Sequence, residues 1–274
     1  MNPANDPSLV AQQYATPDHL DVRQRTHLLY GETPFDLPQA VLDQIHWRGD
    51  EWVVDVGAGT GLYAAPARAR AARYLAADLS FGMLTGLEPG VWRVNLDAAH
   101  LPLAAHSVDV LLANHMLYHV PNQTVALRAF SRVLKPGGVL LAATNSENNM
   151  DQLHTLVESV LFDLCGADAP ISWLAAPTRT FSLENGGARL ETHFRQVGRS
   201  DFSSDLVFPA PEPVIAYVRS SLQAWVEQFR PNQLAWPAVA DALHHRLSRH
   251  LHAHGVFRVT RRAGVFVCRQ PIQS

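Results

Sequence analysis

Residues 52–61 read Trp-Val-Val-Asp-Val-Gly-Ala-Gly-Thr-Gly, a short apolar run with one carboxylate that is followed by three closely spaced glycines. The Val-rich run predicts a buried parallel strand. The glycines permit a tight turn and let a ligand approach backbone amides, and the Ala-rich residues 61–72 predict a helix whose N-terminus points into that turn. Strand, glycine turn and helix together are typical of a nucleotide-type site.

Two classes of cofactor site use such a turn. Dinucleotide sites usually have the spacing G-x-G-x-x-G, whereas Gly57, Gly59 and Gly61 are spaced G-x-G-x-G and follow Asp55. A second apolar run over residues 74–78 ends in Asp78. A carboxylate at that place can accept both hydroxyls of a ribose, although an Asp at a strand end can also cap a turn or a helix. After this glycine turn, we interpret Asp78 as a ribose ligand.

The pattern of elements predicts an α/β fold. Further strands are expected near 91–95, 108–114 and 139–144, and helices over 8–30, 38–45, 80–87 and 122–134, the last one ending at residues 136–138, Pro-Gly-Gly. Alternating strands and helices indicate a parallel sheet covered on both faces, with the ligand beyond the carboxyl ends of the strands.

Four motifs, in this order, resemble those of class I S-adenosylmethionine-dependent methyltransferases of the type 11-like group. They are residues 55–61, the run Asp-Leu-Ser-x-x-Met over 78–83, the run Asn-Leu-Asp-Ala over 95–98, and residues 132–141. The resemblance covers roughly residues 50–145. It implies a Rossmann-like, doubly wound, mostly parallel seven-stranded sheet with an antiparallel last strand. It also implies S-adenosyl-L-methionine as cofactor and S-adenosyl-L-homocysteine as product.

The same resemblance implies roles for individual residues. The acid at Asp97 would meet the adenine amino group, and Ala98 would supply a backbone donor to the ring. Asn114 and His115 would touch the methionine end or the ribose. The cofactor-binding residues expected are Tyr14, Arg23, Asp55, Gly57, Ala58, Gly59, Gly61, Asp78, Leu79, Met83, Asp97, Ala98, Asn114 and His115.

Tyr118 and His119 are the catalytic candidates, as a general base or as groups that orient the acceptor; for His119 a purely structural role is the alternative. The N-terminal segment 8–30 resembles a family arm that folds back over the cofactor. Tyr14 would face the sulfonium, and Arg23 would pair with the methionine carboxylate. An exposed amphipathic arm is the alternative.

The rest of the chain is interpreted as part of one domain, residues 1–274. Its core spans about 36–145 and is completed by 181–208 and 255–270, while 146–180 and 209–254 are helical lid insertions. Residues 256–268 are the candidate for the antiparallel last strand, and 261–264, Arg-Arg-Ala-Gly, read as a turn. The His-rich segment 243–254 is expected to bind no metal, because its leucines form a buried stripe and no Cys, Asp or Glu completes a ligand set.

A small-molecule acceptor is favoured. The net charge of -3 gives no bias towards nucleic acid, no aromatic and basic interleaving suggests a base-stacking platform, and no apolar run is long enough to span a membrane. Two cysteines predict a reducing, cytoplasmic location. The alternatives are an RNA or protein methyltransferase, a non-catalytic cofactor-binding protein and, more distantly, an NAD-linked oxidoreductase. The sequence does not predict the oligomeric state.

Overall fold

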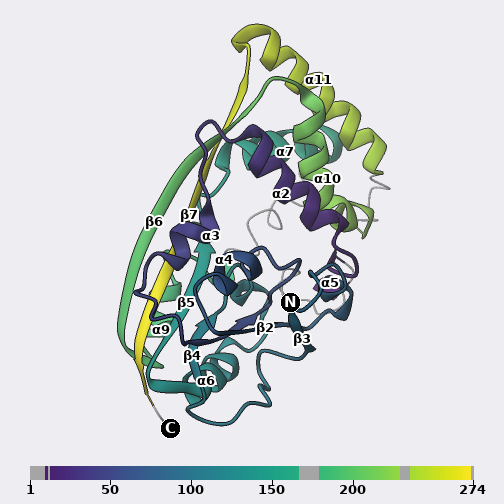
Figure 1. The fold of residues 1–274 in the computed structure, drawn as a ribbon. Helices are drawn as coiled ribbons and strands as arrows, with labels where there is room; N and C mark the ends of the chain where they lie inside the picture. The colour runs from purple at the N-terminus through teal and green to yellow at the C-terminus, as the bar shows by residue number, and fades with distance from the viewer. Residues whose placement is uncertain (1–9, 12, 167–178, 229–234, 273–274) are drawn as a thin grey trace.

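The protein is described by a computed structural model, which covers residues 10–11, 13–166, 179–228 and 235–272. A seven-stranded sheet forms its centre (Figure 1). In spatial order the strands are β3 (Trp92–Asn95), β2 (Arg73–Asp78), β1 (Trp52–Val56), β4 (Val108–Leu112), β5 (Leu134–Asn145), β7 (Phe257–Pro271) and β6 (Phe194–Phe208). The pairs from β3 to β5 are parallel, and β7 is antiparallel to both β5 and β6. This confirms the predicted fold class.

Helices cover both faces of the parallel part. On one face lie α3 (Leu37–Leu42), α4 (Ala64–Arg68) and α5 (Phe81–Leu84), whose apolar residues join the inner face of β1 and β4 in one buried cluster. On the other face α6 (Gln123–Val133) and α9 (Gly186–Leu190) bury Phe130 and Leu190 in a second cluster. Strands covered on both faces need apolar side chains at every position, which explains the unbroken Val-rich runs.

A third apolar cluster lies at the far end of the two long strands. It joins β6 and β7 to α7 (Asp151–Cys165), α10 (Pro211–Gln228) and α11 (Trp236–His254). The helix α2 (Asp18–Tyr30) packs against α10 and β6, so the N-terminal segment lies beside this helical layer (Figure 1). That the segments 146–180 and 209–254 act as lid insertions stays a prediction.

Two local predictions were wrong. Residues 261–264 are not a turn, because β7 runs straight through them and Gly264 pairs with both Asp201 and Thr144. A Cβ at Gly264 would lie 2.6 Å from the Ser200 carbonyl oxygen, so the glycine serves the close approach of two strands. The glycines at 137–138 likewise do not end α6. They lie inside β5, at an irregularity of its pairing with β4. Between the two paired positions β5 advances by five residues, from Leu134 to Val139, while β4 advances by two, from Val108 to Val110.

Helix lengths also differ from the prediction. The helix expected over 61–72 is α4, Ala64–Arg68, and the arm helix is α2, Asp18–Tyr30; residues 8–9 of the predicted arm lie outside the described residues. The glycine turn therefore continues as non-helical turns to Tyr63. Because α4 has five residues, its dipole is a weaker anion site than the sequence suggested.

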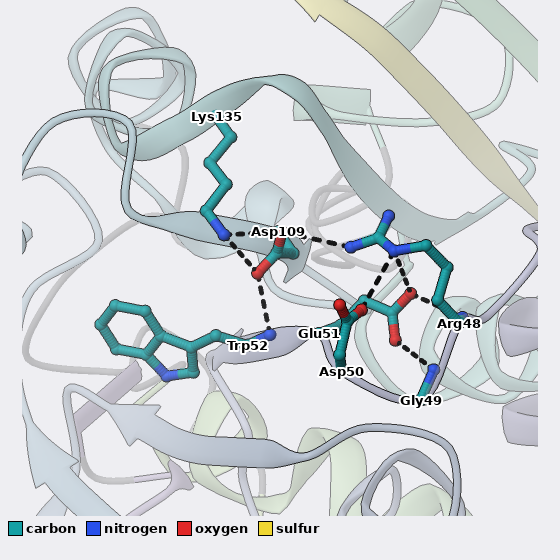
Figure 2. A network of polar contacts seen from close by, with 7 residues as sticks. All are labelled: Arg48, Gly49, Asp50, Glu51, Trp52, Asp109 and Lys135. Carbon is teal, nitrogen blue, oxygen red and sulfur yellow. Dashed lines mark hydrogen bonds and ion pairs between the residues drawn. The ribbon is translucent and has the colours of Figure 1, made fainter.

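A charge network holds the amino ends of the central strands together (Figure 2). The two oxygens of Asp109 at the start of β4 each lie 2.8 Å from Nζ of Lys135, the only lysine of the chain. One of them also accepts a hydrogen bond from the Trp52 amide of β1 at 3.0 Å. The Arg48 guanidinium lies 3.6 Å from the other oxygen, and buried Glu51 accepts from the amides of Arg48 and Gly49. The network ties β1, β4 and β5 together at the edge opposite their carboxyl ends.

Candidate active site

A cleft of about 1610 Å³ opens at the carboxyl ends of β1, β2 and β4. It brings together every residue predicted for the site except Gly61: Tyr14, Arg23, Asp55, Gly57, Ala58, Gly59, Asp78, Leu79, Met83, Asp97, Ala98, Asn114, His115, Tyr118 and His119 all line it. This is the edge at which ligands bind in open α/β sheets.

The glycine turn forms the floor of the cleft. Gly57, Gly59 and Gly61 have φ values of +72°, +56° and +80°, which other residues rarely adopt. A Cβ at Gly57 would lie 2.6 Å from Met116, and one at Gly61 would lie 2.1 Å from Leu87. The amides of Gly57, Ala58 and Gly59 donate within the protein, to the Ala77 carbonyl and the Asp78 carboxylate. The turn thus serves close packing, and it does not present the open row of amides that the sequence suggested.

Asp78 stands at the end of β2 and faces the turn. Its two carboxylate oxygens accept hydrogen bonds of 2.8 Å from the amides of Gly59 and Ser80. A carboxylate has about four acceptor positions, so each oxygen keeps one for a ligand in the cleft. Burial raises the pKa of Asp78 above its ordinary value, and the amide bonds oppose that shift.

Asp55 is the most deeply buried acid of the site. Its Oδ2 accepts a 2.6 Å hydrogen bond from the Tyr74 hydroxyl, and Asp55 is 1% exposed. Burial raises the pKa of Asp55 to about 7, with the nearby Asp78 charge as a smaller cause. The bond to Tyr74 joins the end of β1 to β2 beside the cleft.

Four of the predicted residues line the side of the cleft beyond β2 and β3. Met83 and Ala98 are buried there, whereas Leu79 is 67% exposed. Asp97 is half exposed, and one of its carboxylate oxygens accepts a hydrogen bond from the Ala99 amide at 2.8 Å. An apolar wall next to an acid suits a flat heterocycle with an amino group.

The N-terminal segment crosses the cleft as an arm. The Tyr14 hydroxyl lies 3.0 Å from Nε2 of His119, and the Tyr14 carbonyl accepts from the Ser80 hydroxyl at 2.7 Å. Farther along, the Gln24 amide of α2 donates to the hydroxyl of Thr60 in the turn at 3.0 Å. The arm thus contacts the ends of both β2 and β4.

Four buried polar nitrogens at the cleft have no hydrogen-bond partner among the described residues. They are Nη2 of Arg23, Nδ2 of Asn114, Nε2 of His115 and Nε of Arg261. Arg23 lies 5.5 Å from the ring centre of Tyr14 and donates from Nε to the His19 carbonyl. Unsatisfied buried donors are rare in native proteins, and here they indicate a polar ligand. An anion beside Arg23 fits this donor set.

Comparison with known proteins gives the family. A family model described as a methyltransferase domain matches residues 54–142. The ubiquinone/menaquinone biosynthesis C-methyltransferase of Rhizobium meliloti is 32% identical over 181 residues, which cover 58% of this chain and 70% of that protein. The chain belongs to the S-adenosylmethionine-dependent methyltransferase family. The predicted cofactor, S-adenosyl-L-methionine, is confirmed with it.

Two further proteins are similar to this methyltransferase over different lengths of the chain. The malonyl-[acyl-carrier protein] O-methyltransferase of Yersinia pestis is 36% identical over 104 residues, 37% of this chain and only 39% of that protein. The solved phosphoethanolamine N-methyltransferase 2 of Haemonchus contortus, in complex with phosphomonomethylethanolamine and S-adenosylhomocysteine, has a TM-score of 0.57. It is 13% identical, and the match covers 95% of this chain and 59% of that chain. This likeness shows the fold.

The residues that sequence reasoning missed come from the helical layer and the long strands. Tyr217 of α10 and Arg261 of β7 line the same cleft, far along the chain from the cofactor motifs. The chain offered one signal, an Arg at position 261 within the apolar alternation Phe257-x-Val259-x-x-x-Ala263-x-Val265. The turn wrongly predicted at 261–264 hid that alternation.

Within the described ranges, no group of three or more side chains could hold a metal ion. Two histidines of the His-rich segment in α11, His250 and His254, stack with ring centres 4.3 Å apart. Nδ1 of His254 also lies 2.9 Å from the His250 carbonyl oxygen. The helices that the structure describes include none long and apolar enough to cross a membrane.

Acid should destabilise the methyltransferase through His115. Burial lowers the pKa of His115 from 6.5 to about 4, so the unfolded state takes up a proton that the folded state refuses. The contribution of neutral His115 to the free energy of unfolding is therefore fully present above pH 6.5. It is lost as the pH falls towards about 4, by about 1.4 kcal/mol per pH unit. In urea unfolding across this window, His115→Asn should remove the His115 share of the slope, since Asn accepts the positive φ of 55°, and leave the share of His27, whose burial lowers its pKa to about 3.

His106→Asn is the matched control, because His106 has a φ of 54° and an exposed side chain. It should leave the pH dependence unchanged. Equal slopes in wild type and His115→Asn would assign the acid sensitivity to another group.

Proposed function

We propose that this methyltransferase transfers the S-methyl group of S-adenosylmethionine to a small-molecule acceptor bound under the N-terminal arm. The observation that carries the proposal is the covered cleft, in which Tyr14 reaches His119 while unpartnered donors of Arg23, Asn114 and His115 remain beneath. Relatives named for quinone and malonyl-[acyl-carrier protein] methylation support a metabolite acceptor.

The donor side follows from the residues present. When bound, the cofactor supplies an electrophilic sulfonium methyl, whose bond to sulfur breaks as the acceptor atom bonds to the methyl carbon. Arg23 would donate from its unpartnered Nη2 to the methionine carboxylate. Asp78 would accept the ribose hydroxyls with its remaining acceptor positions. Holding two reactants in line in this way can lower a barrier by roughly 7 to 11 kcal/mol.

The pair of Tyr14 and His119 would take the acceptor's proton. The two rings lie edge to face with centres 5.2 Å apart, and the Tyr14 hydroxyl is within hydrogen-bond distance of Nε2 of His119. A proton leaving the acceptor could pass to the Tyr14 oxygen as the phenol proton moves to His119. His119 thus acts through Tyr14, while the Tyr118 ring makes an edge contact with the His119 ring, with centres 4.6 Å apart.

His119→Ala and Tyr14→Phe should both lower kcat, by roughly a hundred-fold or more, if the pair accepts a proton. Their affinity for S-adenosylhomocysteine should change little. Steady-state kinetics and calorimetry on the same preparations measure both. A wild-type kcat in either variant would assign a structural role to the pair.

Two experiments test the proposal as a whole. Calorimetric titration should show binding of S-adenosylhomocysteine and none of NAD. Incubation with methyl-labelled cofactor and fractionated metabolite pools should then label a small molecule. Label that appears only in RNA or protein would support the alternative acceptor class. Binding without any transfer would support a non-catalytic cofactor-binding protein.

A further inference from the structure

One arginine of the cleft lies in a position that the rest of its strand gives to apolar residues. On this face of the sheet, β6 and β7 present the cross-strand pairs Phe208 with Phe257, Leu206 with Val259, Ser204 with Arg261, and Phe202 with Ala263. The first two pairs belong to the helical cluster, and Val265, two residues beyond Ala263, belongs to the cluster under α3 and α4. The pair of Ser204 and Arg261 is thus a polar gap between two apolar cores.

No carboxylate within the described ranges pairs with Arg261. Its one hydrogen bond among these residues joins Nη1 to Nδ1 of His27 at 3.2 Å, and its Nε is buried without a partner there. A guanidinium can only donate, so His27 must be neutral and accept at Nδ1. Asp205, an acid whose charge acts on Arg261, is bonded to Arg258, which also pairs with Glu32. Arg261 therefore places a positive charge without a direct ion pair at the wall of the cleft.

Polar groups surround this charge on the cleft side. The Tyr217 ring lies edge to face with His27, 5.7 Å between centres, and the Tyr217 hydroxyl donates to the Met150 sulfur at 3.2 Å. A thioether is a weak acceptor, which an anionic oxygen can readily replace. Ser204, the cross-strand neighbour of Arg261, also lines the cleft. Arg261, Tyr217 and Ser204 together make a donor set for one oxyanion.

Arg261 comes from a different element than the predicted cofactor residues, although His27 and Tyr217 interact with both Arg23 and Arg261. The motifs that bind the cofactor lie on β1, β2 and β4 and on the arm, whereas Arg261 projects from β7 beyond Asn145, the last residue of β5. Arg23 already faces the cleft from α2 with its own unpartnered nitrogen. Arg23 and Arg261 are thus two arginines at the cleft, whereas the cofactor has one carboxylate, so one of the two is left for another ligand.

We propose that Arg261, with Tyr217 and Ser204, binds a carboxylate of the methyl acceptor and so selects acidic acceptors. The proposal rests on the proposed function, since it names the class of acceptor for the same cleft. A carboxylate is favoured over a phosphate because Arg261 carries a single charge, neutral His27 adds none, and Asp205 lies nearby.

Binding of simple probes to the complex with S-adenosylhomocysteine tests this. Benzoate, phenyl phosphate and benzyl alcohol serve as the carboxylate, phosphate and neutral probes, and calorimetry or thermal shift gives their affinities. Benzoate should bind wild type more tightly than the other two. Arg261→Gln should weaken benzoate at least about 10-fold, the loss of one charge-assisted hydrogen bond, and leave the affinity for S-adenosylhomocysteine unchanged.

Arg262→Gln is the matched control. The neighbouring Arg262 points to the other face of β7, where it contacts the Asn148 carbonyl and Asp151, so its loss should leave benzoate binding intact. Tyr217→Phe should weaken benzoate by a smaller factor, and it tests the same subsite should Arg261→Gln fail to fold.

Three outcomes would overturn the inference. They are tighter binding of phenyl phosphate or benzyl alcohol than of benzoate, no binding of benzoate at all, or a loss of S-adenosylhomocysteine affinity in a folded Arg261→Gln. Failure of the proposed function looks different, because wild type would then not bind S-adenosylhomocysteine before any probe is added.

Discussion

Asp109→Ala should lower the free energy of unfolding by about 2 to 4 kcal/mol, measured by urea unfolding. The change removes an acceptor with charge-assisted bonds to Lys135 and leaves the Trp52 amide without its partner, and each such loss costs about 1 to 3 kcal/mol. The Asp109 side chain is 12% exposed, so solvent screens this pair less than it screens a surface ion pair.

The pH dependence of this effect follows from the same contacts. The hydrogen bonds from Lys135 and Trp52 outweigh burial and hold the pKa of Asp109 below its ordinary value of 3.8. Asp109 therefore contributes stability that is present above pH 3.8 and is lost as the pH falls through its lower folded pKa. The difference between wild type and Asp109→Ala should shrink in that range.

Two variants separate the parts of the network. Asp109→Asn keeps an acceptor for the Trp52 amide but loses the charge, so it should lie between wild type and Asp109→Ala. Asp50→Ala removes an acid of the same cluster that is 74% exposed, and it should change stability by less than about 0.5 kcal/mol. Equal effects of Asp50→Ala and Asp109→Ala would contradict a special role for the buried acid.

The same variant separates stability from binding. The network joins the amino ends of β1, β4 and β5, whereas the cleft lies at the carboxyl ends of the strands. Asp109→Ala, kept below its melting temperature, should therefore bind S-adenosylhomocysteine like wild type.

The part of the site that is predicted to bind the cofactor could be found from the sequence, because its motifs are local. The glycine turn, Asp78 and Asn114 each follow an apolar strand directly, and parallel strands bring their carboxyl ends to one edge by topology alone. Hydrogen bonding within the turn was not predictable, since which amides remain open depends on how the Asp78 carboxylate is turned towards Gly59.

The acceptor side was hidden for a different reason. In the sequence, a glycine looks the same whether it forms a turn or allows two strand backbones to approach closely. For Gly264, only the pairing of β7 with β6 and β5 distinguishes the two cases. The pairing of β7 positions Arg261 at the cleft, and α10, a helix from another part of the chain, positions Tyr217 there. Contacts between such distant segments leave no periodic trace in a single sequence.

Asp78→Ala should weaken S-adenosylhomocysteine binding by about 10-fold to 100-fold in calorimetry. The carboxylate has acceptor positions left for the ribose hydroxyls, and a charge-assisted hydrogen bond contributes about 1.5 to 3 kcal/mol. Loss of the carboxylate also frees the Gly59 amide, so the turn loses the contact that holds it against the end of β2. Both effects act on affinity in the same direction.

Asp78→Asn divides the two effects. Its amide oxygen can still accept from Gly59 and keep the turn closed, but it lacks the charge, so an intermediate loss of affinity is expected. Asp241→Ala, at an exposed position of α11, is the control and should bind like wild type. If Asp78→Ala bound S-adenosylhomocysteine with unchanged affinity, the acid would serve the turn alone. The ribose would then have to be held by other groups, and the exposed Asp97 beyond β3 would be the next carboxylate to test.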